Sequence, residues 1–340
     1  MELSEDASLL EQPTRYFQQN ADRRIIIDGI QRAPELFVLL RAIVDQRREP
    51  ARFILLGSAS PCLLRKSSES LAGRIAYTEL MPFALNELPP EINLQTHWFR
   101  GGFPDALLAP NDTMCGRWLE SLIKTFIERD VRLLGYELAP AALVRLITVL
   151  TSVHGNLLNV SDLSRTLGIS QPTVKHYLDI LEGAFLIIRL QPYFINPTKR
   201  LVKSPKLYIR DSGILHRLSN IHSTNAILDN ILAGASWEGY VIEQIRRAIF
   251  NRWEYFFYRT QKGAETDLLL IAPNGKKTIV EIKLNISPTL SRGFYEVKED
   301  IKPNYSYVTT PDSKNYQRDD GLHILSLIDF LNFEIPKIYS

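Results

Sequence analysis

The stretch RIIID at residues 24–28 is a short apolar run that ends in a carboxylate. Residues 34–44 follow with leucine and isoleucine at helical spacing, and RFILLGS at residues 52–58 is a second apolar run. This order predicts a βαβ unit with two parallel strands. A continuous β-branched run is typical of a strand that is covered on both faces, so we expect both faces of this sheet to be buried. A further strand is expected at residues 75–80.

Composition limits the class of protein. The 340 residues are 45% hydrophobic and carry a formal net charge of +2, which excludes a disordered, fibrous or strongly basic chromatin-type protein. Cys62 and Cys115 are too few for a disulfide framework or a four-cysteine zinc site. The polar, acidic N-terminus is unlike a signal peptide, and no apolar run approaches the roughly 20 residues that span a bilayer. These features predict a cytoplasmic protein without a membrane segment.

The end of the first strand has the form of a Walker B motif. Asp28 would stand at the carboxyl end of a parallel strand, where open α/β sheets bind ligands, and it could hold Mg²⁺ through a water molecule. Ser58, which closes the second strand, could sense a γ-phosphate. The alternative is that both residues only end strands of a domain that no longer binds nucleotide.

Residues 159–181 have the pattern of a helix-turn-helix. Leucine and valine side chains supply an inward face, Gly168 stands at the turn, and Ser170 can cap the second helix. On a DNA-reading helix, the groups placed to contact bases or phosphates are Gln171, Thr173, Lys175 and His176.

The residues that follow the helix-turn-helix are basic and resemble the wing of a winged helix. Residues 189–210 hold six Lys and Arg side chains and no acid, and Lys199, Arg200 and Lys203 are the predicted phosphate contacts. Winged helices also bind proteins, and the helix-turn-helix itself is nearly neutral, so a protein partner is the alternative to DNA.

A third set of residues points to metal-dependent chemistry. Asp267 lies near the start of one predicted strand, and Glu281 and Lys283 lie two residues apart on the next, after an Asn274-Gly275 hairpin turn. Two carboxylates can hold Mg²⁺ and the lysine can orient a water, which is the PD-(D/E)xK nuclease pattern. A helix at residues 235–250 would add Glu238, with Glu243 as the alternate. The competing interpretations are an ordinary Glu–Lys contact and a nuclease-like fold that does not cut.

The chain as a whole resembles the AAA+-type ATPases of bacteria and archaea that carry a C-terminal domain of unknown function. The resemblance covers nearly all of the sequence, in order, and the segments that carry it include residues 25–45, 52–60, 69–88, 101–108, 117–131, 204–218, 234–245, 263–270 and 280–283.

Two departures from that family bear on activity. The family opens with a phosphate loop of the form GxxxxGK[ST], which is absent here, and it has Asp-Glu where this chain has Asp28-Gly29. The loop binds the β- and γ-phosphates, and the glutamate polarises the attacking water, a role worth about 10²–10⁴ in rate. We therefore expect no ATP hydrolysis, and expect the missing strand and loop to be encoded upstream of Met1. Arg74 could face phosphate or another subunit, although an arginine after a glycine turn is also an ordinary surface residue.

The predicted architecture is a multidomain α/β protein. Residues 1–95 are expected to form a partial P-loop NTPase-like parallel sheet, and residues 96–224 a helical region with a winged helix-turn-helix at about 157–210. Residues 225–340 are expected to form a PD-(D/E)xK-like α/β domain. The predicted function is that of an ATPase-family member that acts through DNA or protein contacts. The alternatives are a Mg²⁺-dependent nuclease and a protein-interaction module without catalytic activity.

The missing phosphate loop gives a direct prediction about ATP. We expect calorimetric titration of the chain with ATP and Mg²⁺ to show no binding, because the lysine and backbone amides that hold the phosphates are lacking. A micromolar affinity would contradict this interpretation of the N-terminal region.

Overall fold

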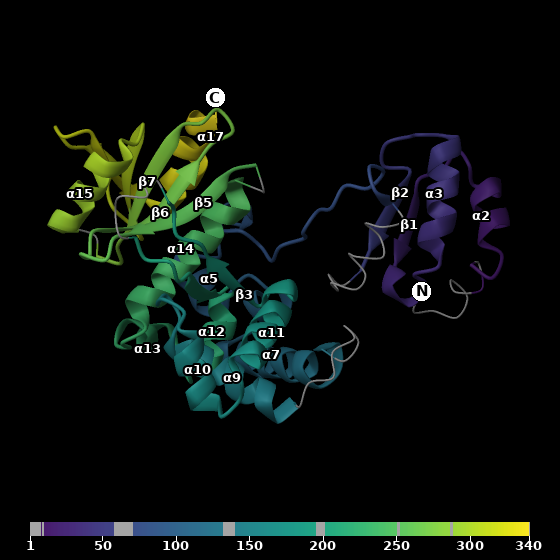
Figure 1. Cartoon of the computed structure of the whole chain (residues 1–340), viewed down its shortest axis with the longest axis horizontal. Coiled ribbons are helices and arrows are strands. Elements are labelled where there is room, and N and C mark those ends of the chain that lie inside the picture. The colour runs from purple at the N-terminus through teal and green to yellow at the C-terminus, as the bar shows by residue number, and fades with distance from the viewer. Residues whose placement is uncertain are drawn as a thin grey trace. The chain divides into compact units, whose positions relative to one another are not determined.

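The structure is a computed structural model that describes residues 8, 10–57, 71–131, 140–194, 201–249, 252–285 and 288–339. The chain divides into two compact units (Figure 1). Unit 1 comprises residues 1–80 and 130–137, and unit 2 comprises residues 81–129 and 138–340. The chain is thus a mixed α/β protein of more than one domain.

Unit 1 contains the predicted strand, helix and strand. Its two strands pair in parallel, with Ile25 opposite Phe53, and α3 packs against them through Phe37 and Leu40. Phe17 of the preceding helix completes this core. The elements are α2 (Pro13–Gln19), β1 (Ile25–Asp28), η1 (Ile30–Arg32), α3 (Leu36–Gln46) and β2 (Phe53–Leu56).

Two expectations for unit 1 are wrong. Only one face of the sheet is buried, because Ile26 is 63% exposed and Leu56 is 45% exposed, while Ile25 and Ile27 are buried. Within the described residues the sheet has two strands, and its core lies on a single face. Residues 75–80 form no strand, since no described strand pairs with them.

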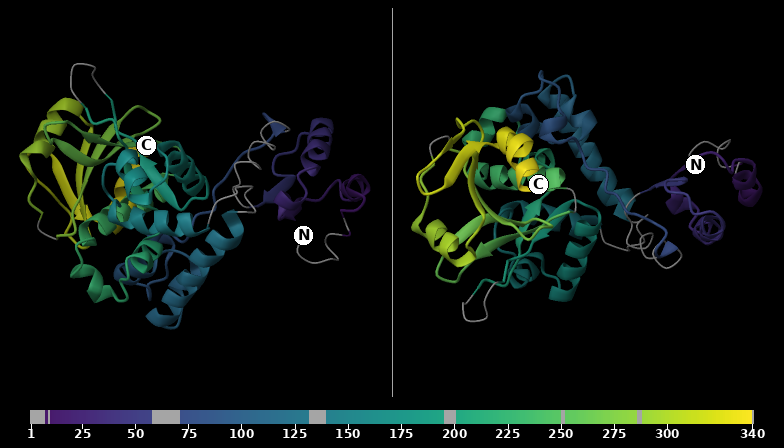
Figure 2. Two further views of the ribbon diagram at one scale, coloured as in Figure 1. Left: turned by 60° about the horizontal axis from the view of Figure 1, so that its bottom comes forward. Right: turned by 90° about the horizontal axis from the view of Figure 1, so that it is seen from above.

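Unit 2 contains a six-stranded mixed sheet between two layers of helices (Figure 2). The first three strands are antiparallel, β7, β8 and β10 are parallel, and β9 is an antiparallel edge. In order across the sheet they are β5 (Glu254–Arg259), β6 (Glu265–Ile271), β7 (Lys277–Ile282), β8 (Tyr305–Thr310), β10 (Leu322–Ser326) and β9 (Tyr316–Gln317). The two predicted strands that carry Asp267 and Glu281 are confirmed as β6 and β7, and Lys283 comes directly after β7.

Alternating side chains of this sheet bury both of its faces. Leu268 and Leu270 pack into the core that contains α14 (Ala233–Ile249), whereas Leu269 packs into the core that contains α15 (Arg292–Ile301). The core on the α14 side also takes in Leu327, Phe330 and Ile335 of the C-terminal helical turns. These turns are α16 (Leu327–Asp329), η4 (Phe330–Glu334) and α17 (Ile335–Tyr339).

The rest of unit 2 is mainly helical and includes a short antiparallel pair of strands. Its elements are η2 (Leu85–Glu87), α5 (Leu94–Arg100), α6 (Pro104–Leu107), α7 (Asp112–Thr125), η3 (Phe126–Asp130), α9 (Pro140–Ser152), α10 (Val160–Leu167), α11 (Gln171–Gly183), β3 (Ile187–Leu190), β4 (Lys206–Ile209), α12 (Ser212–Leu218) and α13 (Thr224–Leu228).

The helical region and the sheet region share one core. The rings of Trp98 in α5 and Trp237 in α14 lie 5.3 Å apart, edge to face, and the Trp98 indole donates a hydrogen bond to Ser236. A Cβ at Gly213 would lie 2.1 Å from the Arg100 carbonyl oxygen, so the approach of α12 to α5 requires glycine. The regions 96–224 and 225–340 therefore pack as parts of a single compact unit.

The helix-turn-helix follows the capping pattern expected from the sequence. Asn159 caps α10 by accepting from the backbone N–H groups of Ser161 and Asp162, and Gly168 ends the helix at φ +67°. Ser170 caps α11 by accepting from Thr173 N at 3.2 Å. The sequence therefore located both helices and the turn between them.

Three buried histidines are held neutral by burial, which outweighs the opposing effect of the backbone carbonyl that each one contacts. His154 accepts from Ile209 N at Nδ1 and donates to the Ala235 carbonyl at Nε2. His216 likewise joins Phe99 O to Ser236 Oγ, and His97 joins Phe83 O to the Tyr240 hydroxyl. Burial lowers the pKa of His154 to about 3 and the pKa values of His97 and His216 to about 4.

These histidines should make unit 2 sensitive to acid. Their folded pKa values lie below the ordinary 6.5, so protons bind the unfolded chain first, and stability falls as pH drops below 6.5. Each group is expected to cost about 2 kcal/mol at pH 5. The measurement is the midpoint of urea unfolding, monitored by tryptophan fluorescence at several pH values. This signal reports the unfolding of unit 2, because all four tryptophans lie in it. His154→Gln should flatten the pH dependence, and the exposed control His176→Asn should not. Equal pH dependence in wild type and His154→Gln would contradict the prediction.

Candidate functional site

The predicted acidic site forms a cluster in unit 2. Asp267 and Glu281 come from the adjacent strands β6 and β7, and Glu238 comes from the first turns of α14. Two charged residues that the sequence analysis did not assign to the site, Glu265 and Lys206, complete it. We call these residues, together with Lys283, the acidic cluster.

Strand register places the two central carboxylates side by side. Leu268 pairs with Val280, and Asp267 and Glu281 are the next residues toward the same end of the two strands. The Asp267 Oδ2 atom accepts a hydrogen bond from Ile282 N at 2.8 Å, and Lys283 Nζ lies 2.8 Å from Glu281 Oε1. The Asp, Glu and Lys of the predicted pattern thus do converge.

Lys206 enters the cluster from β4. Its Nζ atom lies 2.9 Å from Glu238 Oε1, 2.7 Å from Glu265 Oε1 and 4.0 Å from Asp267 Oδ1, and its side chain is only 4% exposed. The Tyr208 hydroxyl, two residues along the same strand, donates to Glu238 Oε1. One element of the helical region therefore supplies the cation that pairs with carboxylates of α14 and β6.

Burial and neighbouring charges shift the pKa values of residues in the acidic cluster. Burial, followed by the neighbouring carboxylates of Glu238 and Glu281, raises the pKa of Asp267 well above its ordinary value. Burial also raises the pKa of Glu281, although Lys283 opposes the shift. Burial lowers the pKa of Lys206, but the carboxylates around it outweigh this effect and raise that pKa above its ordinary value. Carboxylates so crowded would gain from additional positive charge.

The residues present do not fit a divalent metal ion in this arrangement. The Lys206 ammonium lies between three of the carboxylates, the Asp267 Oδ2 atom is taken by Ile282 N, and Glu281 Oε1 is taken by Lys283. Within the described residues, no group of three or more His, Cys, Asp or Glu side chains has an arrangement that could hold a metal. The cluster therefore contains carboxylate oxygens of the type that Mg²⁺ prefers, but the Lys206 ammonium lies among them.

Glu243, the alternate acid on α14, belongs to a different cluster. Its carboxylate lies 2.8 Å from Arg210 Nη2 and 2.5 Å from Arg246 Nη1, and Arg247 is 3.8 Å away. Burial raises its pKa, but the three guanidinium groups outweigh burial and lower the pKa to about 2. Glu243 is thus a buried counter-ion for arginines.

The candidate DNA-contacting residues lie mostly on the surface. Gln171, Lys175 and His176 of α11 are exposed, as is Lys203 before β4, whereas Thr173 is half-buried and its hydroxyl bonds that of Ser170. Lys199 and Arg200 lie outside the described residues.

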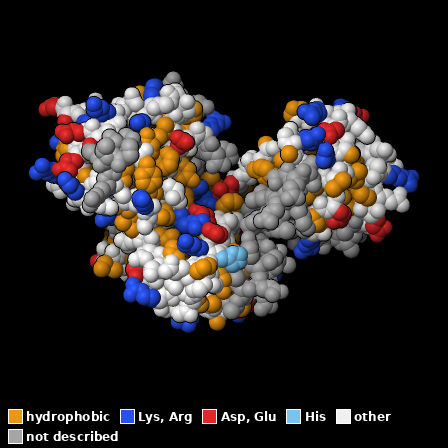
Figure 3. All heavy atoms as spheres, viewed as in Figure 1, with side chains coloured by type: hydrophobic (Ala, Val, Ile, Leu, Met, Phe, Trp, Pro, Cys, Tyr) orange, Lys and Arg blue, Asp and Glu red, His pale blue; other side chains and the backbone are white. Residues whose placement is uncertain are grey.

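Most of the described cations in the basic stretch 189–210 are engaged inside the unit. Arg189 bonds Glu182 and Asp179 of α11, Arg210 bonds Glu243, and Lys206 lies in the acidic cluster. On the face shown in Figure 3, basic and acidic side chains are interspersed over the described surface. The described cations of this stretch therefore do not form one exposed basic patch.

The candidate nucleotide residues of unit 1 are placed only in part. Asp28 is exposed at the end of β1, next to Gly29 at φ +73°. Arg74 binds Asp45 of α3 through two bonds, of 2.6 and 2.9 Å, which assigns it a structural contact within the unit. Ser58 lies outside the described residues.

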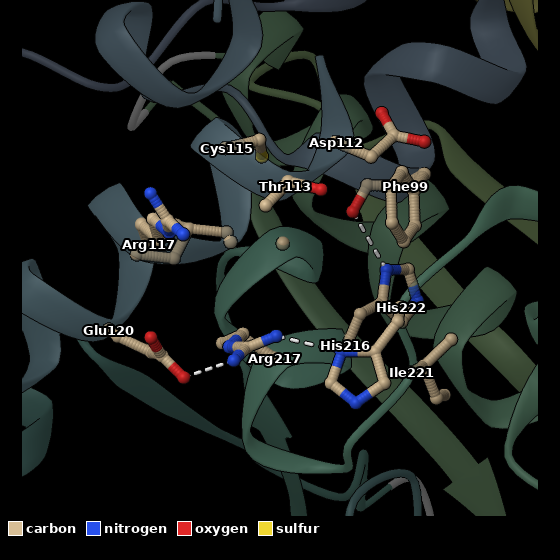
Figure 4. A pocket seen from close by; sticks show the side chains of 13 residues that line it. Phe99, Asp112, Thr113, Cys115, Arg117, Glu120, His216, Arg217, Ile221 and His222 are labelled. Carbon is tan, nitrogen blue, oxygen red and sulfur yellow. Dashed lines mark hydrogen bonds and ion pairs between the residues drawn. The ribbon is translucent and has the colours of Figure 1, made fainter.

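A pocket of about 340 Å³ lies elsewhere in unit 2, between α7 and α12 (Figure 4). Arg217 bridges Glu120 and His222 at this pocket, and Cys115 lines it. Burial raises the pKa of the Cys115 thiol to about 11, so it is a neutral thiol at physiological pH. Cys115 is therefore not an activated nucleophile.

Sequence reasoning missed Glu265, Lys206 and Tyr208. Glu265 stands two residues before Asp267, so the two-residue repeat of a strand was a signal that could have found it. Lys206 and Tyr208 lie about 60 residues before that strand and were grouped with the basic stretch. Their place depends on tertiary packing.

Three family models match successive parts of the chain. Residues 2–89 match an AAA domain, residues 91–225 match a domain of unknown function (DUF8612), and residues 233–330 match another (DUF4143). These matches support an AAA-like ATPase family.

The relatives found are described only as uncharacterized proteins. Proteins of Mycobacterium tuberculosis and Mycobacterium bovis are 38% identical over 296 residues, which is 87% of this chain and 66% of theirs. A protein of Methanocaldococcus jannaschii is 22% identical over 314 residues, which is 83% of this chain and 68% of that protein. No solved structure matches significantly. Within the described ranges, none of the helices has both the length and the apolar character needed to cross a bilayer.

Proposed function

We propose that the chain is an AAA-like ATPase-family protein that binds duplex DNA through the helix-turn-helix α10–α11 and does not itself hydrolyse ATP. The observation that carries the proposal is the surface of α11. Its first two turns present Gln171, Lys175 and His176 to solvent, while Val174 and Leu178 anchor the helix in the core. This is the arrangement by which a recognition helix enters a major groove.

The β3–β4 hairpin beside this helix is held firmly against the sheet. Tyr193 N donates to Phe257 O at 2.8 Å and Val202 N donates to Arg259 O at 3.1 Å, which ties both arms of the hairpin to β5. The hairpin is thus a fixed neighbour of α11, which supports its proposed role as a wing. Lys203 is the exposed described cation on it.

Binding should depend on few phosphate contacts, because Arg189, Lys206 and Arg210 are occupied by internal partners. Substituting Gln171, Lys175 and His176 together by alanine should weaken duplex binding about tenfold or more. It should also make the slope of log affinity against log salt shallower by about 1 for each phosphate that the variant no longer neutralises. Fluorescence anisotropy with a labelled duplex at several salt concentrations measures both quantities.

Two matched variants give this experiment its controls. Lys199, Arg200 and Lys203 changed together to alanine test the hairpin's share, while Lys314→Ala removes an exposed lysine on the β8–β9 connection and should leave affinity unchanged. Equal duplex affinity in wild type and the α11 variant would overturn the proposal and favour a protein partner for this surface.

A Mg²⁺-dependent nuclease is the second candidate, favoured by the convergence of Asp267, Glu281 and Lys283. For the wild-type chain we expect no cleavage of plasmid or branched DNA with Mg²⁺ or Mn²⁺, because Lys206 stands among the carboxylates. Cleavage that disappears in Asp267→Ala and Lys283→Ala would establish the nuclease instead.

A further inference from the structure

The acidic cluster contains a cation that belongs to the protein. Lys206 is nearly inaccessible, and its ammonium makes ion pairs with Glu238 and Glu265 while lying 4.0 Å from Asp267. These carboxylates come from α14 and β6, whereas Lys206 comes from β4. A surface lysine would instead keep its ammonium in water.

We propose that Lys206 is the resident cation of the acidic cluster and occupies the position that a divalent metal ion would need, so that metal enters only when the lysine is withdrawn or removed. The proposal is independent of DNA binding by α11. The proposal concerns the cation that the carboxylates bind, and its outcome does not depend on what α11 binds.

The backbone of β4 delivers this ammonium and limits its movement. Lys206 pairs with Leu190 of β3 on one side, and Leu157 forms a bridge to it on the other. The Tyr208 hydroxyl fixes Glu238 against the same strand. Withdrawal of the ammonium therefore requires a new side-chain rotamer or a shift of the hairpin.

A second observation shows that the cluster has unused capacity for a ligand. The Glu281 side chain is 8% exposed, and its Oε2 atom is buried without a hydrogen-bond partner among the described residues. The four carboxylates of the cluster are paired with the ammonium groups of Lys206 and Lys283 and, through Glu265, with the Arg259 guanidinium. Carboxyl groups therefore outnumber these described cations. A buried carboxylate oxygen without a donor is costly, and a cation is the partner that would satisfy it.

Charge explains why metal and lysine exclude each other. A divalent ion bound to Asp267 and Glu238 would share its ligands with an ammonium already within 4.0 Å of both carboxylates. Like charges at such distances repel strongly where water is excluded. Removal of the ammonium leaves the same oxygens facing each other with a deficit of positive charge, and a metal ion would meet that deficit.

The test is the binding of Mn²⁺ to the full chain, measured by titration calorimetry. Wild type should take up no ion at this site under the conditions in which Lys206→Met binds one Mn²⁺ per chain. Adding Asp267→Asn to Lys206→Met should abolish that binding. Lys206→Arg keeps the positive charge and should behave as wild type.

A charge-balanced variant protects the test against misfolding. Lys206→Ala combined with Glu265→Ala removes one charge of each sign, leaves the formal charge of the cluster unchanged, and should also bind Mn²⁺ and melt at a higher temperature with it. Circular dichroism confirms that each variant is folded. The proposal is overturned if wild type binds Mn²⁺ in an Asp267-dependent way, or if folded variants without Lys206 bind none. Neither result depends on the outcome of the DNA-binding experiment.

Discussion

Charges that leave water must be paired, and this constraint determines how unit 2 is joined together. Lys206 ties β4 to α14 and β6, and Arg210 ties the end of the same strand to Glu243 on α14. Such pairs add little net stability compared with hydrophobic packing, but removing one partner costs about 3–5 kcal/mol. In the observed seating of the hairpin on the sheet, both of these buried cations have partners.

Because buried charges must be paired, the number of charged residues in this segment differs from the charge that its surface exposes. All four residues of β4 are buried, and its lysine points to internal carboxylates instead of solvent. Arg189 is likewise paired with Glu182 and Asp179 of α11, so charges of both signs next to the helix-turn-helix are partly neutralised. A count of lysines and arginines along this segment consequently overstates what a phosphate backbone would meet.

Local signals predicted much of this fold, and tertiary contacts determined the rest. Gly168 and Ser170 located the helix-turn-helix, and Asn274-Gly275 with a two-residue repeat brought Asp267 beside Glu281, because turns and registers are set within a few residues. The exposure of Ile26 and the absence of a strand at residues 75–80 were not predictable, since they depend on which of the described elements cover or pair with these segments. Lys206 was visible as a residue but not as part of a site, because its partners are distant in sequence.

The two candidate sites of unit 2 lie at opposite ends of one continuous set of contacts. Arg189 of β3 binds Glu182 and Asp179 of α11, Leu190 pairs with Lys206 across the hairpin, and Lys206 reaches Glu238 and Glu265. A displacement of α11 would therefore act on the strand that carries the resident cation. The continuous contacts provide a route between the two sites, but the size of any coupling depends on binding free energies. A ligand on α11 changes the occupancy of the acidic cluster only to the extent that it binds the seated and withdrawn positions of the hairpin with different affinities.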